Sequence, residues 1–420
     1  MLKRFLLNSK NKIKSAYQWN ASATLLNAFQ TVFILLLISR MDPVNDAGVF
    51  TIAFAIANLM LTIGKYGIRQ FQVSDVDEKY SFREYRASRV ITCIAMMIAS
   101  VIYIAVCFFA GSYNVSKCIV VALICVTKMI DAFEDVYHGN LQQHMHLDIA
   151  GKILTIRLAV YIVVYMVVYF VTGNLIIASG ASLLVMLVLF LALNRMAWEK
   201  IDSKPDPIDG TQVKQLIKEC FPLFISSFLV VYIGNAPKYA IDAVMSSEAQ
   251  ACFNYIFMPV FVISLLNQTL YQPMIGKLAI LWHDENIGAF KKMIFRQLLI
   301  IVVLSLAVVV GGHYLGIPVL SIIYGVNLKA YRSSLTILLM GGSSLAIVNF
   351  LQMIITVIRK QKRLIIGYLV AAILFLVFGN RIVSAYGIIG ISVYYSVVVT
   401  IIGIVFAGII IGSVHQSQRH

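Results

Sequence analysis

Long apolar segments follow one another along almost the whole chain, and short basic loops separate them. Each segment has about 20 to 28 residues, and about 20 helical residues cross the roughly 30 Å hydrocarbon core of a bilayer. Lipid offers the backbone no hydrogen bonds, so such segments cross it as helices. The chain is 60% hydrophobic and only 13% charged, against about 25% charged residues in soluble domains. The sequence therefore predicts an all-α polytopic membrane protein.

We expect about twelve transmembrane helices, in two sets of six. The segment 198–213, WEKIDSKPDPIDGTQV, is the most polar and proline-rich part of the chain and separates the two sets. Residues 1–197 would form an N-terminal lobe and residues 214–420 a C-terminal lobe. Both sets begin on the same side of the membrane, which predicts two six-helix pseudo-symmetric lobes around a central cavity. The expected spans are 16–40, 46–69, 88–111, 117–140, 149–172, 174–195, 215–237, 249–272, 296–316, 331–358, 364–384 and 387–412.

The basic residues are distributed unevenly between the two sides of the predicted bundle. Of the 34 Lys and Arg residues, 26 fall on the side of the N-terminus and six on the opposite side, while Lys128 and Arg157 lie within spans. Basic residues concentrate on the cytoplasmic side of membrane proteins. We therefore expect both termini to be cytoplasmic, and we assign the net charge of +15 to topology rather than to nucleic-acid binding.

One predicted span, 117–140, carries several charges. Its purely apolar part, 118–127, is only about 15 Å long at about 1.5 Å per residue, so the charged turns must complete the crossing. The charged side chains fall within an arc of roughly 120° on the helix. A charge near the bilayer centre costs roughly 2.5–3.5 kcal/mol, so this face must look into a bundle interior or a wet cavity. The residues of the charged face are Lys128, Asp131, Glu134, Asp135 and His138.

Two interpretations of this charged face stay open. Lys128 is expected near the membrane midplane and can pair with Asp131 at i,i+3; Arg157 is the nearest second cation. The face could be a structural ion pair at the end of an amphipathic helix. It could instead be a cavity wall, with cations for an anionic substrate and carboxylates that exchange protons or sodium.

No cofactor or metal is expected. Asp75 and Asp77 form a D-x-D pair, and His144 and His146 lie two residues apart, but in charged loops such pairs are typical of solvated turns. The sequence has no Walker A motif, so this chain is not expected to use ATP.

Two stretches resemble the polysaccharide-transport (Wzx-type) flippases of the multidrug/oligosaccharidyl-lipid/polysaccharide exporter superfamily. The run from Asp46, DAGVFTIAFA, through GKYGIR, which ends at Arg69, is similar to the second span of these flippases. DAFEDVYHGNLQ from Asp131, with LDIAGK after it, is similar to their fourth span and following loop. With the number and orientation of the spans, the resemblance covers essentially the whole chain.

The resemblance implies transport of an undecaprenyl-diphosphate-linked oligosaccharide from the inner to the outer leaflet of a bacterial plasma membrane, by alternating access and driven by an ion gradient. A diphosphate needs cations in a low-dielectric cavity. The residues expected to bind substrate are Lys128 and Arg157, with Arg69 and Lys65 nearer the cytoplasmic mouth. The residues expected in coupling or gating are Asp131, Glu134 and Asp135. Expected partners are the lipid-linked oligosaccharide, membrane lipids, a polysaccharide polymerase and glycosyltransferases.

Two other functions are weighed against this one. A drug or organic-cation antiporter of the same superfamily needs a membrane-embedded acid, whereas the midplane ion here is Lys128, which favours an anionic cargo. A membrane-embedded polysaccharide polymerase tends to have a long external loop, and every expected external loop here is short. We therefore do not expect an enzyme.

Overall fold

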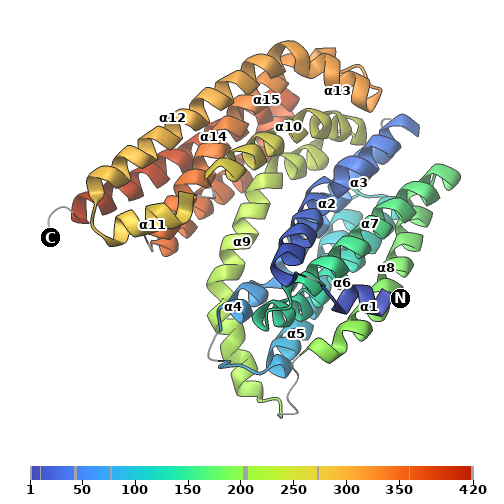
Figure 1. Cartoon of the computed structure of the whole chain (residues 1–420). Helices are drawn as coiled ribbons and strands as arrows, with labels where there is room; N and C mark the ends of the chain where they lie inside the picture. Colours follow the sequence, from blue (N-terminus) through green and yellow to red (C-terminus); the bar gives the residue numbers. More distant parts are fainter. Residues whose placement is uncertain are drawn as a thin grey trace. The chain divides into compact units, whose positions relative to one another are not determined.

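The computed structural model describes residues 2–9, 11–41, 45–75, 78–201, 207–271, 274–358 and 360–417 (Figure 1). Within these ranges the regular structure is helical and contains no strand, which confirms the predicted all-α class. Nine helices of this part of the chain are long and apolar enough to cross a membrane. One of them, α15 (Leu364–Ser417), holds two predicted spans, because the backbone breaks at Gly387 with φ 58° and ψ −146°. With α6 (Val115–Gln143) and α10 (Ser247–Tyr271), the twelve predicted spans all have a helix.

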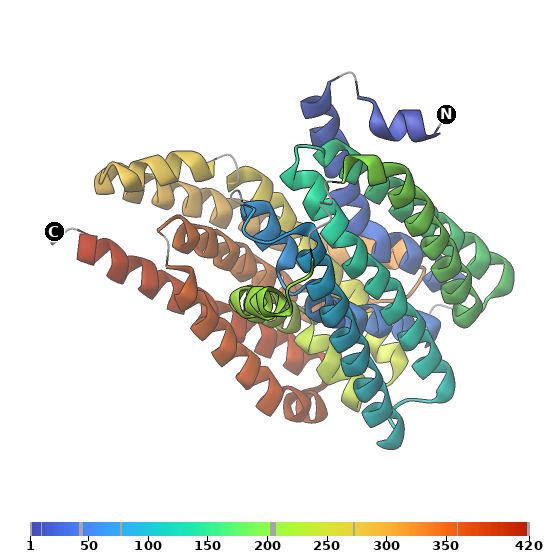
Figure 2. The ribbon, with the colours of Figure 1, turned by 90° about the horizontal axis from the view of Figure 1, so that it is seen from below.

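The chain forms two compact units, Met1–Val231 and Tyr232–His420. The helices of the first unit are α1 (Leu2–Leu7), α2 (Lys12–Met41), α3 (Asn45–Lys65), α4 (Ile68–Ser74), α5 (Phe82–Phe109), α6, α7 (Leu147–Thr172), α8 (Leu175–Ala197) and the first part of α9 (Gly210–Val244). The second unit holds the rest of α9, then α10, α11 (Ile275–His283), α12 (Ile287–Gly311), α13 (Ile317–Tyr324), α14 (Arg332–Val357) and α15. Figures 1 and 2 show α1 beside the helices of the first unit, where it contacts α7 and α8.

The two units divide within α9 because the first turns of this helix pack against the first unit. Lys79 Nζ lies 2.7 Å from Glu219 Oε1, and the rings of Tyr66 and Phe224 stack with their centroids 4.6 Å apart. The lobe boundaries predicted from the linker 198–213 stay a prediction, since its residues 202–206 lie outside the described residues.

Four short helices, α1, α4, α11 and α13, fall where the sequence predicts loops or a span end. The predicted span 46–69 stops early, because Gly67 adopts the left-handed region with φ 71° and separates α3 from α4. Glycine adopts this conformation at little cost. The break turns the chain so that α4 can contact α6 as a separate short helix.

The helix α6 is the centre of the first unit, with α3, α4, α5, α7 and α8 all in contact with it. It begins at Asn114, whose side-chain oxygen accepts a hydrogen bond from the Lys117 backbone N–H at 2.8 Å. Its closest neighbour is α3, and Gly64 allows the approach. A Cβ at Gly64 would lie 2.8 Å from Ala132 Cβ and 2.7 Å from Met96 Sδ.

Gly64→Leu tests this close packing. The added side chain has no room between α3 and α6, so we expect a loss of about 1–3 kcal/mol of folding free energy and a lower Tm of the detergent-solubilised protein. Gly180→Leu in α8 is the matched control, because nothing lies within 4 Å of the Cβ position there. Equal Tm values for the two variants would contradict the close approach.

Candidate functional site

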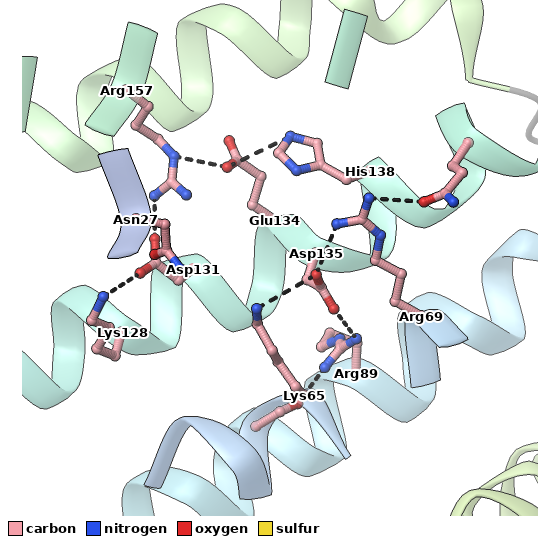
Figure 3. Close-up of polar contacts among 12 residues, drawn as sticks. Asn27, Lys65, Arg69, Arg89, Lys128, Asp131, Glu134, Asp135, His138 and Arg157 are labelled. Atoms are coloured by element: carbon pink, nitrogen blue, oxygen red, sulfur yellow. Dashed lines mark hydrogen bonds and ion pairs between the residues drawn. The ribbon is translucent and has the colours of Figure 1, made fainter. Parts of the chain in front are cut away.

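The charged face of α6 lies inside the first unit and meets basic side chains from several other helices (Figure 3). Glu134 is fully buried, and Lys128, Asp135 and His138 are also buried. A buried charge is tolerated when an opposite charge or a set of hydrogen bonds replaces its water. The contacts of this face fall into two groups, one around Arg157 of α7 and one around Asp135 of α6.

The first group connects α6 to α7 and α8. Lys128 Nζ lies 3.1 Å from Asp131 Oδ2, so the pair expected from the i,i+3 spacing is present. Arg157 contacts two carboxylates, with Nη1 2.6 Å from Asp131 Oδ1 and Nε 2.7 Å from Glu134 Oε2. The side-chain amide of Asn194 donates a hydrogen bond of 2.8 Å to Glu134 Oε1. Lys128 and Arg157 are only 3% and 1% exposed, so in this conformation both are held by carboxylates away from solvent.

The second group gathers three cations on one carboxylate. Asp135 Oδ2 lies 3.2 Å from Arg89 Nη2, while its Oδ1 lies 3.3 Å from Arg69 Nη1 and 3.7 Å from Lys65 Nζ. Arg89 is fully buried and also donates a hydrogen bond to the carbonyl of Gly64. The side chains of Lys65 and Arg69 are 44% and 26% exposed. The accessible positive charge of the site is therefore at the end of α3 and in α4.

Charge is not balanced within this α6 network, which we define as the five basic and three acidic side chains of the two groups. With His138 neutral, five positive and three negative charges leave an excess of two positive charges. Each of the three carboxylates already contacts at least one cation. The network can thus accept an anion more readily than a further cation, because Coulomb interactions are strong in surroundings of low dielectric constant.

All seven residues named from the sequence for binding or coupling belong to this network, and their roles stay predictions. The sequence analysis did not single out Arg89, because this residue stands at the start of the expected span 88–111 and was counted with the basic residues of the cytoplasmic side. The helix α5 instead begins at Ser81, whose hydroxyl and Glu84 form a capping box. A Ser-x-x-Glu pattern is a recognisable helix start, and it would have placed Arg89 two turns inside the membrane helix.

In the described ranges, no three His, Cys, Asp or Glu side chains lie together as metal ligands would. Asp75 accepts a hydrogen bond of 2.7 Å from the Tyr85 hydroxyl and others from the Lys79 and Tyr80 backbone N–H groups. It therefore organises the loop before α5, while Asp77 lies outside the described residues.

Comparison with known proteins matches residues 17–279, more than half of the chain, to the family described as polysaccharide biosynthesis protein. A capsular polysaccharide biosynthesis protein, CapF of Staphylococcus aureus, is 23% identical over 384 residues, which cover 88% of this chain and 91% of that protein.

Solved structures of transporters have the same fold. The lipid II flippase MurJ in an inward closed conformation matches with a TM-score of 0.74 and 12% identity, over 94% of this chain and 88% of that one. An inward-facing multidrug resistance MATE family transporter of the MOP superfamily matches with a TM-score of 0.66 and 13% identity, over 94% and 96%. At these identities the likeness shows the fold alone. Together with the apolar helices, it identifies a multi-pass membrane protein.

Arg157→Met tests the central contact of the network. The change leaves Glu134 without a guanidinium partner, and removing one partner of a buried ion pair typically costs about 3–5 kcal/mol. We expect a low yield of monodisperse protein and a lower Tm in detergent. The double variant Arg157→Met/Glu134→Gln is the control and should recover part of the loss, because it no longer buries the unpaired Glu134 carboxylate. A wild-type Tm for Arg157→Met would rule out this contact as a stabilising one.

Proposed function

The chain belongs to the polysaccharide biosynthesis protein family, and from this premise we propose that it is a flippase for a lipid-linked oligosaccharide. The proposed substrate is an undecaprenyl-diphosphate-linked oligosaccharide, which moves from the inner to the outer leaflet of a bacterial plasma membrane for surface polysaccharide synthesis. The 26-to-6 distribution of basic residues supports cytoplasmic termini. In this orientation, Lys65 ends α3 on the cytoplasmic side, and Arg69 follows it in the first turn of α4.

The excess of two positive charges in the α6 network is the observation that carries this proposal. A diphosphate brings at least two negative charges into the membrane and needs cations that have already lost part of their water. The planar guanidinium of Arg69 matches phosphate oxygens, and the Lys65 ammonium adds a point charge. These two side chains are also the accessible ones of the network.

Binding of the diphosphate would compete with Asp135. Of its three cations, Lys65 and Arg69 make the longer contacts, at 3.7 and 3.3 Å, while Arg89 is fully buried and also bound to the Gly64 carbonyl. Phosphate oxygens can thus replace Asp135 at Lys65 and Arg69, and Asp135 keeps Arg89. The carboxylate remains paired throughout, so the exchange avoids an uncompensated buried charge.

The same competition offers a route for ion coupling. Asp131 holds both Lys128 and Arg157, and Glu134 holds Arg157 a second time. A proton or Na+ on either carboxylate would weaken its hold on these cations and free them for the diphosphate. Two ligands that change each other's affinity in this way are coupled reciprocally.

The main alternative is an antiporter for organic cations, and the charge of the network argues against it. A cationic drug would have to enter a site with excess positive charge, whose three carboxylates already contact basic side chains. The likeness to a multidrug transporter concerns the fold. The anionic cargo therefore agrees better with the residues present.

The double variant Lys65→Gln/Arg69→Gln tests the proposed substrate contact. We expect at least a tenfold loss of glycan export, which corresponds to roughly the binding free energy of one charge-assisted phosphate contact. The lipid-linked oligosaccharide should accumulate inside the cell, while the variant protein is still found in the membrane. Lys79→Gln is the matched control, since Lys79 pairs with the exposed Glu219 outside the network. Wild-type export by the double variant would contradict the proposed binding role.

Asp131→Asn and Glu134→Gln test the proposed coupling. Each variant keeps a side chain of similar shape and removes a negative charge that a proton or Na+ could neutralise. In proteoliposomes with a fluorescent lipid-linked oligosaccharide, we expect wild-type transport to rise with an imposed H+ or Na+ gradient and variant transport to be independent of it. Full gradient dependence in both variants would remove these two residues as the coupling site.

A further inference from the structure

Another buried cation, Lys238, lies in the C-terminal unit and is not part of the α6 network. It belongs to the last turns of α9 and is only 9% exposed. Its Nζ lies 5.7 Å from the ring centroids of both Phe257 and Phe261 in α10. Across the described part of the chain, no carboxylate lies within salt-bridge distance of this ammonium group.

Four cations that are buried more deeply than Lys238, at 3% exposed or less, differ from it in this respect. Arg89, Lys128 and Arg157 each contact a carboxylate. Lys152 donates hydrogen bonds to the carbonyls at the end of α1 and to a serine hydroxyl. Among the described residues, the contacts of the Lys238 ammonium group are with two aromatic rings, both near the outer limit of about 6 Å for a cation–π contact. Such contacts offset little of the cost of taking an ammonium group out of water. The Lys238 site is therefore suited to an anion that is not part of this chain.

The face of α10 beside Lys238 has the chemistry of a lining surface. Gln250, Asn254, Phe257 and Phe261 are spaced i, i+4, i+7 and i+11, so they form one stripe along the helix. Gln250 is fully buried, yet neither its side-chain nitrogen nor its oxygen has a hydrogen-bond partner. Phe261 is 39% exposed, so the stripe is accessible at the end next to Lys238. The stripe thus offers aromatic faces beside the cation and, further along the helix, a side-chain amide without a hydrogen-bond partner.

From this arrangement we infer that Lys238 binds the diphosphate of the lipid-linked substrate on the C-terminal unit, near the outer end of its path. The inference rests on the proposed function. Lys238 lies six residues before the end of α9 at Val244, the end predicted to face outward, whereas Lys65 ends α3 on the predicted cytoplasmic side.

Site-specific amine labelling tests this assignment on the full chain. The protein is placed in phosphatidylcholine nanodiscs and treated with methyl acetimidate, and amidination of Lys238 is followed by peptide mass spectrometry. Farnesyl diphosphate serves as the prenyl diphosphate probe, and phosphatidylglycerol, added to the nanodiscs, as the source of an ordinary phospholipid phosphate. We expect farnesyl diphosphate to slow the labelling of Lys238 at least about fivefold, while phosphatidylglycerol does not. Absence of protection, or equal protection by phosphatidylglycerol, would overturn the assignment.

Variants extend the test to transport. Lys238→Gln should lower glycan export and farnesyl diphosphate affinity about tenfold, the size expected for one charge-assisted hydrogen bond, while Lys238→Arg keeps most of both. Lys329→Gln is the matched control, because Lys329 is an exposed lysine of the same unit. If Lys238→Gln does not fold, the Lys238→Arg variant and labelling of the wild-type protein still test whether Lys238 binds the diphosphate.

The outcomes separate this inference from the proposed function. If the wild-type protein neither exports glycan nor binds farnesyl diphosphate, the proposed function fails. If the wild-type protein does both, and Lys238→Gln does both equally well, the proposed function stands and the role of Lys238 is refuted.

Discussion

The structure of the N-terminal unit depends on the contact of Arg157 with Asp131 and Glu134. Charges placed inside a membrane protein must be paired, because lipid and packed side chains cannot replace their water. The charged face of α6 therefore requires neighbours that bring basic groups to it. The helices α3, α4, α5 and α7 each bring at least one, which explains why α6 is central although it carries the most charged residues of the predicted spans.

The features that could be predicted from the sequence are those that the local spacing of residues determines. The apolar spans, the charged face of α6 and the Lys128–Asp131 pair follow from helix geometry alone, and the structure contains all three. The partners of Glu134 and Asp135 could not be predicted, because they come from helices whose packing against α6 depends on tertiary contacts. The break at Gly67 was missed for a different reason: a single glycine does not by itself mark the end of a helix, and the left-handed backbone conformation of Gly67 separates α4 from α3.

The same ion pairs that hold the helices together are the ones that a diphosphate would use. Lys65 and Arg69, at the end of α3 and in α4, are connected to α6 through Asp135. An anion that takes these two cations also removes part of the attraction between α6 and its neighbours. Binding then favours any conformation in which these contacts are looser, and this differential affinity is what shifts a conformational equilibrium. In the proposed flippase, substrate recognition and helix movement would thus share one set of charges.

The buried charges of the two units differ, and in the proposed flippase this difference would let each unit bind a diphosphate with a different strength. The N-terminal unit has a network with two excess positive charges, whereas the C-terminal unit has Lys238 among aromatic rings and amides. A substrate that passes through a membrane must be bound strongly enough to enter and weakly enough to leave. In the proposed flippase, the strongly cationic α6 network would bind the diphosphate tightly. The single ammonium of Lys238 would bind it less tightly, so that water and lipid headgroups could compete for it.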